Sequence, residues 1–292
     1  MAISRRRAAE GPQGPGPIRA SGWLAGVLTR GAFVLGLLAA SCAGENISTD
    51  LVKPEVIQQR LEAGAVAASK RQDTIRRLFE HVGCAAQEQR VDRKSANVIC
   101  ALPGETPSTI VIGGHIDFVE LGQGIVDDWS GASLLPSLYQ ALKSRTHHHT
   151  YVFVAFTKEE EGMVGSSRYV KNLTAEEKAA IRAFVNLECL GLSPTKVWVN
   201  RSTPALVSRL LEVGGALRLP IQAVNVDRVG DDDTHPFFSA KIPVISIHSL
   251  TQKTFGILHS PGDKLSAVRS GEYYDTYRLV TLYLAYLDTK LE

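Results

Sequence analysis

The sequence has little excess charge, few cysteines and no long apolar run. Lys and Arg number 32 against 30 Asp and Glu, and the first 41 residues hold five Arg and one Glu, which leaves 27 basic and 29 acidic residues in the other 251. A near-neutral body gives no electrostatic reason to expect nucleic-acid binding. With 44% hydrophobic and 21% charged residues the chain is neither disordered nor fibrous, and its body can bury one large core as a single domain.

The apolar segment near the amino terminus is too short to cross a membrane. Residues 31–40 give roughly ten uninterrupted apolar residues, where about 20 are needed. An Arg-rich stretch precedes them and small residues (Ala39, Ala40, Ser41) end them, as in a secretory signal. The following Cys42 resembles a bacterial lipoprotein processing site, which implies cleavage before Cys42 and a lipid on its sulfur.

We therefore expect three parts: a signal peptide over 1–41, a short tether over 42–50 and a folded domain over 51–292. A lipid on Cys42 would make the protein an exported, periplasmic or outer-membrane-anchored lipoprotein. An ordinary export signal, giving a secreted protein, and an uncleaved anchor are the alternatives.

Only four cysteines are present, and their spacing matches neither a zinc knuckle nor a CxxC redox site. With Cys42 lipidated, Cys84, Cys100 and Cys189 would remain, an odd number that cannot all pair. Cys84 and Cys100 flank two short expected strands, so a bridge between them is possible in an exported protein. Cysteine is therefore not where we expect the chemistry.

Continuous apolar runs alternate with helical patterns after residue 50. Buried strands are predicted over 109–113, 151–156, 181–187 and 242–247, shorter strands over 87–91 and 96–101, and helices over 52–82, 130–142, 165–173, 205–217 and 273–291. This alternation predicts an α/β fold, a three-layer α/β/α domain with a mixed, mostly parallel central sheet. Functional residues of such sheets gather at the carboxyl ends of the strands.

Acids and imidazoles follow these expected strands. The segments are Gly114-His115-Ile116-Asp117, Asp127-Asp128, Glu159-Glu160-Glu161, Glu188, and His259-Ser260-Pro261-Gly262-Asp263. His115 and Asp117 lie two apart, so both face one side of an extended chain, and a metal-binding imidazole commonly donates its other N–H to a carboxylate. Three consecutive acids repel one another unless a cation offsets them. Each segment alone could be a solvated turn or a helix cap, but five at successive strand ends indicate a metal site.

In this order the segments GGHxD, DDxSG, EExGxxGS, NxExxG and HSPxD resemble the M28 family of zinc aminopeptidases, over about residues 108–290. The resemblance implies a zinc-exopeptidase-like fold and two Zn²⁺ ions per chain. One ion would be held by His115, Asp127 and Glu188, and the other by Asp127, Glu160 and His259. Glu159 would be the general base, Asp117 would support His115, and the peptide bond before Asp128 would be cis.

Two departures from the family pattern are visible. Glu188 stands where many members have Asp, and the usual Ser-Asp-His is here Asp232-Asp233-Thr234, with His235 shifted by one. The second departure concerns substrate contacts rather than the metals. The cluster His147-His148-His149 precedes a strand at the opposite end of the sheet, where we expect a solvated turn.

The resemblance implies an exopeptidase that removes N-terminal residues from peptides by metal-assisted hydrolysis, with Glu159 moving the proton. Zinc is favoured over magnesium because two of the five ligands are imidazoles. A glutaminyl cyclase that uses one zinc ion, a carboxypeptidase of the same family, and a lipid-anchored binding protein with a vestigial site are the alternatives.

Overall fold

The computed structural model describes residues 40–42, 45–47, 49–227 and 230–292. The expected signal peptide therefore lies almost entirely outside the described residues. Two short strands pair antiparallel: β1 (Ala40–Cys42), which spans the expected boundary between signal peptide and tether, and β2 (Glu45–Ile47), which lies within the expected tether. Within the described residues, no helix combines the length and apolar character needed to cross a membrane.

An eight-stranded sheet forms the centre of the domain, in the order β3-β4-β6-β5-β7-β10-β8-β9. Its strands are β3 (Gln87–Arg90), β4 (Ala96–Leu102), β5 (Thr109–His115), β6 (Thr150–Phe156), β7 (Ile181–Glu188), β8 (Lys196–Val197), β9 (Gln222–Ala223) and β10 (Val244–His248). The four central strands, β6, β5, β7 and β10, are mutually parallel. The pairs β3–β4, β4–β6 and β8–β10 are antiparallel, and the edge strand β9 is parallel to β8. The predicted mixed, mostly parallel sheet is confirmed.

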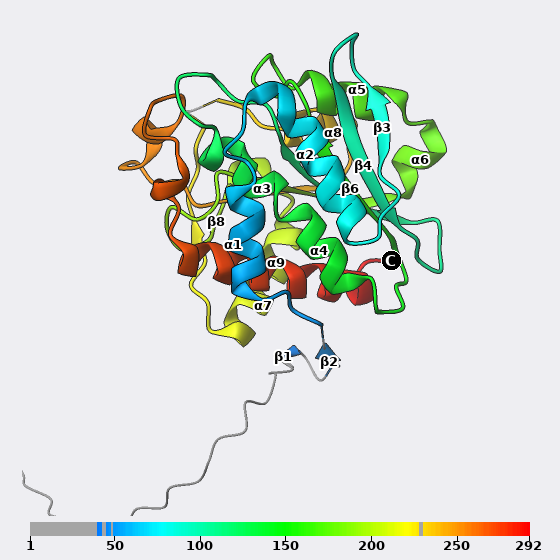
Figure 1. Ribbon diagram of the computed structural model, residues 1–292. Coiled ribbons are helices and arrows are strands. Elements are labelled where there is room, and N and C mark those ends of the chain that lie inside the picture. The colour runs from blue at the N-terminus through cyan, green and yellow to red at the C-terminus, as the bar shows by residue number, and fades with distance from the viewer. Residues whose placement is uncertain (1–39, 43–44, 48, 228–229) are drawn as a thin grey trace, which may run out of the picture. The chain divides into compact units, whose positions relative to one another are not determined.

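Helices cover both faces of this sheet (Figure 1). One face carries α1 (Pro54–Glu62), α2 (Ala68–His81), α4 (Leu135–Leu142), α7 (Pro204–Leu217) and α9 (Ser270–Lys290). The other carries α5 (Val164–Asn172), α6 (Ala175–Ala180) and α8 (Thr234–Ser239). The three-layer α/β/α fold is therefore confirmed, and the helix over 164–172 matches its prediction closely.

Two predicted helices are interrupted. The expected helix over 52–82 is two helices, α1 and α2, because the turn between them brings Gly64 against the ring of Trp129, where a Cβ atom would lie 2.1 Å from Cδ1. The expected helix over 130–142 begins with a short turn, α3 (Ser130–Ala132), and α4 restarts beside Pro136. Proline is accepted in the first turn of a helix but not in its interior.

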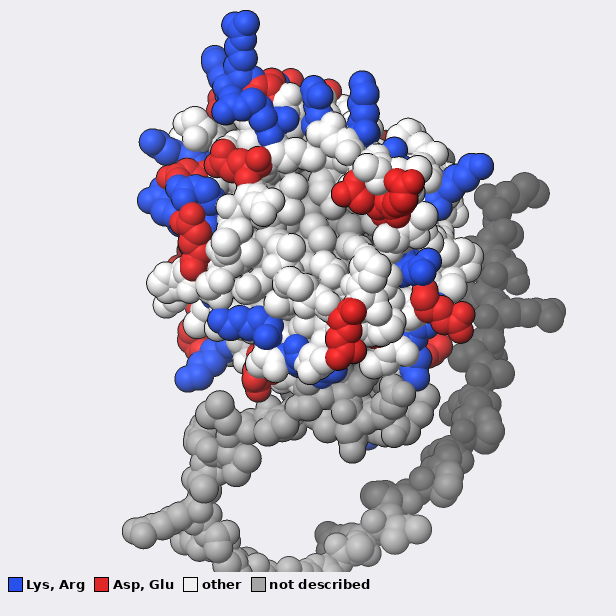
Figure 2. Space-filling model, turned by 90° about the vertical axis from the view of Figure 1, so that its right-hand side faces the viewer, with Lys and Arg blue, Asp and Glu red and all other residues white. Residues whose placement is uncertain are grey.

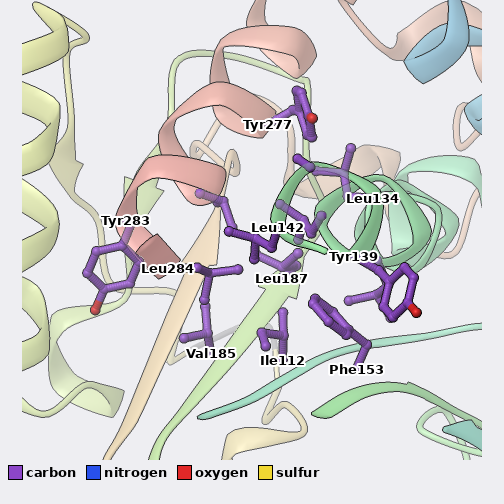
Figure 3. Close-up of a cluster of buried hydrophobic side chains, with 14 of the residues drawn as sticks. Ile112, Leu134, Tyr139, Leu142, Phe153, Val185, Leu187, Tyr277, Tyr283 and Leu284 are labelled. Atoms are coloured by element: carbon purple, nitrogen blue, oxygen red, sulfur yellow. The ribbon is translucent and has the colours of Figure 1, made fainter. Parts of the chain in front are cut away.

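The core follows the period of two along the central strands. Ile110 and Ile112 of β5 face the α4 and α9 side, whereas Val111 faces the α5 and α8 side. Figure 3 shows side chains of α9, including Tyr277, Tyr283 and Leu284, above Ile112, Val185 and Leu187 of the sheet. A sheet packed on both faces is rigid, which fixes the positions of its strand ends.

A disulfide joins Cys84, just after α2, to Cys100 in β4, with a sequence separation of 16, and Cys189 is free and buried. The pairing left open by the sequence is therefore present in the structure. On the face drawn in Figure 2, basic and acidic side chains are interspersed without a continuous field of one sign. This agrees with the near-neutral charge of the chain outside its first 41 residues.

Candidate metal centre

The predicted site residues come together at one edge of the sheet. His115 ends β5, Glu188 ends β7, and Glu159 and Glu160 follow the end of β6. These strands are parallel and in register, with His115 opposite Phe156 and Gly113 opposite Asn186, so their carboxyl ends lie side by side. Strand register thus places His115 and Glu188 side by side and brings the start of the Glu159–Glu160 turn to the same edge.

Asp127 occupies the centre of the group. Its Oδ1 lies 3.1 Å from Nε2 of His115, and its Oδ2 lies 3.3 Å from Nε2 of His259. One carboxylate therefore faces two imidazoles that are 144 positions apart in the sequence, one with each oxygen. The peptide bond between Asp127 and Asp128 is cis, as the resemblance implied.

The remaining predicted ligands surround this carboxylate on both sides. On the His115 side, Oε1 of Glu188 lies 3.5 Å from Nε2 of His115. On the His259 side, Oε2 of Glu160 lies 2.9 Å from Nε2 of His259. The sets expected for the two ions, which share Asp127, are therefore each brought together in space.

Glu159 lies beside the His115 side of the group. Its Oε2 is 3.8 Å from Nε2 of His115, and its side chain is 13% exposed, lining the same pocket as Asp127 and Glu188. A general base must be within reach of the water or substrate it serves, and a position on the pocket wall meets that condition.

Asp117 acts differently from the expected support of His115. Nδ1 of His115 lies 3.1 Å from the backbone carbonyl of Asp117 and 3.7 Å from its carboxylate. The carboxylate instead accepts the backbone N–H groups of Glu159 and Glu160, each at 3.1 Å. Asp117 therefore orients His115 through its carbonyl and holds the Glu159–Glu160 turn through its side chain.

Two further acids hold the backbone around Asp127. Asp263 accepts the N–H groups of Val126 at 2.7 Å and Asp127 at 3.3 Å, and Asp128 accepts those of His115, Gly131 and Cys189. Both acids belong to segments singled out in the sequence, but apart from Gly131 each donor lies outside the segment of the acid that it contacts. Their structural role could therefore not be assigned from the motif alone.

Backbone strain gathers at this edge. Lys158, Cys189 and His259 have φ values of 58°, 50° and 52°, in the left-handed region that non-glycine residues rarely adopt. The first two adjoin Glu159 and Glu188, and the third is itself a predicted ligand. Such conformations cost on the order of 1–3 kcal/mol each and are typical of functional sites.

The ionisation of the group is strongly coupled to its burial and crowding. Burial together with neighbouring carboxylates raises the pKa of Glu159 to about 10 and that of Glu160 to about 7. Burial is the largest influence on both Asp127 and His115 and opposes their charge, but the hydrogen bonds and opposite charges around each group together exceed it. They lower the pKa of Asp127, which faces His115 and His259, and raise that of His115, which faces several carboxylates. Hydrogen bonding to Asp127 raises the pKa of His259 to about 9.

The donor set fits divalent zinc. Candidate ligand atoms of His115, Asp127 and Glu160 lie within 4.8 Å of one another, as do those of His115, Asp128 and Glu188. Oε1 of Glu160 is buried and has no hydrogen-bond partner, an oxygen left free for a cation. Imidazole nitrogens with carboxylate oxygens are typical zinc ligands, and a cation offsets the repulsion among these acids.

A pocket with a volume of about 380 Å³ opens beside these residues. Its apolar wall is formed by residues from the segment between β7 and His259: Trp198, Val226, Leu250, Phe255 and Leu258. The sequence analysis did not identify this wall, because the residues are scattered over several loops without a motif. Gly122 packs against the His259 loop, where a Cβ atom would lie 2.3 Å from the carbonyl oxygen of Ser260.

The shifted Asp-Thr-His segment places its acids inside the protein. Asp232 accepts hydrogen bonds from Thr234 and Ser246, and Asp233 is fully buried and close enough to Glu159 to raise the pKa of that carboxyl. His235 pairs with Asp231 at 2.6 Å and is half exposed. His235 therefore lies outside the metal group.

The prediction of a solvated turn over residues 147–149 is wrong. His147 and His149 are buried, and the ring of His149 contacts Ser108 Oγ at 2.6 Å and the carbonyl of Leu291 at 3.1 Å. Asp288 of α9 accepts the backbone N–H groups of His148 and His149. The segment is buried because the carboxyl-terminal helix covers it, which local sequence does not reveal.

Comparison with known proteins agrees with this geometry. The model of peptidase family M28 matches residues 97–284. Leupeptin-inactivating enzyme 1 of Streptomyces exfoliatus is 30% identical over 156 residues, which are 52% of this chain and 35% of that enzyme. The chain thus spans about a third of that relative's length.

Two solved structures show the fold. A zinc aminopeptidase from Bacillus subtilis is similar with a TM-score of 0.60 and 22% identity, over 68% of this chain and 50% of that one. The glutaminyl cyclase of Porphyromonas gingivalis is similar with a TM-score of 0.65 and 18% identity, over 79% of this chain and 95% of that one. The family model covers more than half of the sequence and includes every predicted ligand, so the chain belongs to peptidase family M28.

Proposed function

We propose that the protein is a zinc-dependent aminopeptidase that binds two metal ions. The observation that carries this proposal is the position of Asp127, whose two oxygens face His115 and His259 separately. A carboxylate placed in this way can serve two ions at once. One ion would be held by His115, Asp127 and Glu188, and the other by Asp127, Glu160 and His259.

In the proposed reaction, the metal ions and the residues of the chain have different roles. Bound metal supplies Lewis-acid polarisation of the scissile carbonyl and lowers the pKa of water. Glu159, on the pocket wall, takes the proton from the attacking water and returns it to the leaving amine. His115 is held for its task by Asp117, whose carbonyl faces the ring nitrogen pointing away from the site.

The pocket supports a preference for apolar N-terminal residues. Its wall of Trp198, Val226, Leu250, Phe255 and Leu258 would bury an aliphatic or aromatic side chain next to the acids that face the substrate's amino group. Burying a leucine-sized side chain stabilises a complex by roughly 1.5–3 kcal/mol. Leucyl substrates should therefore be cleaved faster than glycyl substrates.

The decisive experiment compares Glu159→Gln with the native chain and with Glu161→Gln. Glu161 is a neighbouring, exposed acid that pairs with Lys158, so it controls for the substitution itself. The Glu159 variant should retain its zinc and lose about 10²–10⁴-fold in turnover, whereas the Glu161 variant should stay near the native rate. Native turnover in Glu159→Gln would remove Glu159 from this role.

Glutaminyl cyclase activity is the second candidate, because this chain covers 95% of the solved cyclase but only half of the solved zinc aminopeptidase. The two activities give different products from a peptide that begins with glutamine. Release of free glutamine supports the aminopeptidase, and release of ammonia supports the cyclase. Release of a carboxyl-terminal residue would indicate a carboxypeptidase, and zinc binding without turnover would indicate a binding protein.

We further propose that the protein is exported and anchored by a lipid on Cys42. Small residues precede this cysteine, and an apolar segment precedes them. The Cys84–Cys100 disulfide supports an oxidising compartment, since such bonds are rare in the cytosol.

A further inference from the structure

Arg71 is a buried cation close to the metal centre that belongs to none of the recognised segments. It lies in α2, before the region matched by the family model, and is only 1% exposed. No acidic side chain of the described chain forms an ion pair with it. Burying a guanidinium without a carboxylate partner is unfavourable because the group loses its hydration. Other contacts in the protein must offset that loss of free energy.

Its contacts are three backbone carbonyls and the rings of Phe118 and Trp129. Nη1 donates to the carbonyl of Ile116 at 3.2 Å, and Nη2 donates to those of Gln123 at 2.5 Å and Gly64 at 3.2 Å. The guanidinium carbon also lies 4.1 Å from the ring centre of Phe118. A planar fork with five donors can reach several acceptors at once, which a lysine ammonium on a flexible stem cannot do with the same geometry.

These contacts join the two ends of one loop. Ile116 lies between His115 and Asp117, and Gln123 comes directly before the turn that delivers Asp127. Phe118, stacked on the guanidinium, lies between the two carbonyls in sequence. The loop from 116 to 123 thus runs from the first predicted ligand to the central one, and Arg71 holds its beginning and its end together.

The surrounding charges explain why a cation is tolerated there. Burial lowers the pKa of Arg71 to about 10, while Asp263, Asp128, Asp117 and Asp127 act in the opposite direction. The guanidinium donates its hydrogen bonds to carbonyl oxygens and not to these carboxylates. It can therefore stay charged beside the site without occupying a ligand atom.

We propose that Arg71 is a positioning residue for the metal centre. By fixing both ends of the 116–123 loop, it keeps the side chains of His115 and Asp127 close enough to bind the same metal ion. The inference rests on the proposed function only in taking His115 and Asp127 as zinc ligands. Arg71 positions both His115 and Asp127. The affinity for the ion held by His115, Asp127 and Glu188 should therefore depend on Arg71 more than the affinity for the ion held with Glu160 and His259.

The test compares Arg71→Lys with Arg60→Lys. Arg60 is also buried, lies on the neighbouring helix α1, and donates to the neutral side chains of Ser137 and Gln140. Both variants keep a positive charge and both should lower the melting temperature. Zinc affinity of each metal-free full chain would be measured by competition with a chromophoric chelator, with circular dichroism to establish that the chain is folded.

Arg71→Lys should lower zinc affinity about 10- to 100-fold at the site formed by His115, Asp127 and Glu188, which is the usual effect of losing a group that orients a ligand. Excess zinc should restore part of kcat. Arg60→Lys should bind zinc as the native chain does. Equal zinc affinities in the two variants would overturn the inference. If the native chain itself binds no zinc, the proposed function fails instead.

If Arg71→Lys does not fold, Phe118→Leu replaces it as the test. This change removes the ring stacked on the guanidinium but leaves Arg71 and every predicted ligand in place. A several-fold loss of affinity at the same zinc site is expected. Native affinity in a folded Phe118→Leu chain would also overturn the inference.

Discussion

The disulfide between Cys84 and Cys100 offers a prediction whose magnitude follows from the structure. It closes a loop with a sequence separation of 16 that joins the end of α2 to β4. Constraining a loop of this size in the unfolded chain contributes about 3 kcal/mol of stability. Replacing both cysteines with alanine should therefore lower the free energy of unfolding by about 3 kcal/mol.

For a domain of this size, a loss of 1 kcal/mol shifts the melting temperature by about 2–4 °C, so a decrease of roughly 6–12 °C is expected. Equilibrium unfolding in urea would give the free energy, with the zinc concentration fixed because bound ligand also stabilises. Neither cysteine lines the pocket, so the rate of peptide hydrolysis at 25 °C should be unchanged.

Reduced native protein is the matched control. It should unfold at the urea midpoint of the double variant, because both lack the same cross-link. A double variant within 1 kcal/mol of the oxidised native chain would refute the reasoning, since the loop would then contribute no constraint.

Three other predictions follow from single features of the chain. Chelation of metal should stop peptide hydrolysis and lower the melting temperature, and added zinc should restore both; full activity in metal-free protein would contradict the assigned ligands. Burial lowers the pKa of His149, so the free energy of unfolding should fall as the pH drops below about 6.5, where the unfolded chain takes up the proton first. His149→Gln removes the ring that contacts Ser108 and Leu291, so it should lower the free energy of unfolding in urea by about 1–2 kcal/mol at pH 7.5 and reduce this acid dependence. An unchanged dependence on pH in the variant would contradict the assignment. Cys42→Ser should abolish incorporation of labelled palmitate in a bacterial host, and continued labelling would exclude Cys42 as the lipid site.

The order of strands and helices was predictable because their signals are local. β5, β6 and β7 are continuous apolar runs, and each ended within two residues of its predicted limit. The interrupted helices were not predictable to the same degree, since the break at Gly64 depends on Trp129, which is 65 positions away. Periodicity describes the face a helix presents but not the distant ring that limits its length.

The candidate ligands were also predictable, because each lies at the end of a strand or in the loop that follows it, and parallel strands bring their carboxyl ends together. The partners of those ligands were not. Asp117 contacts His115 through its carbonyl, and its carboxylate holds the Glu159–Glu160 turn. Which atom of a side chain meets which donor depends on loop geometry that short motifs do not encode.

The sequence by itself determined the α/β class and the order of the motifs along the chain. It also predicted His115, Asp127, Glu160, Glu188 and His259 as one candidate set of ligands. Only the tertiary structure decided that each oxygen of Asp127 faces a different imidazole, and that Arg71 reaches both ends of the intervening loop. The physical reason is range: backbone preference and apolar period act over a few residues, whereas ligand geometry is set by packing between segments far apart in the chain.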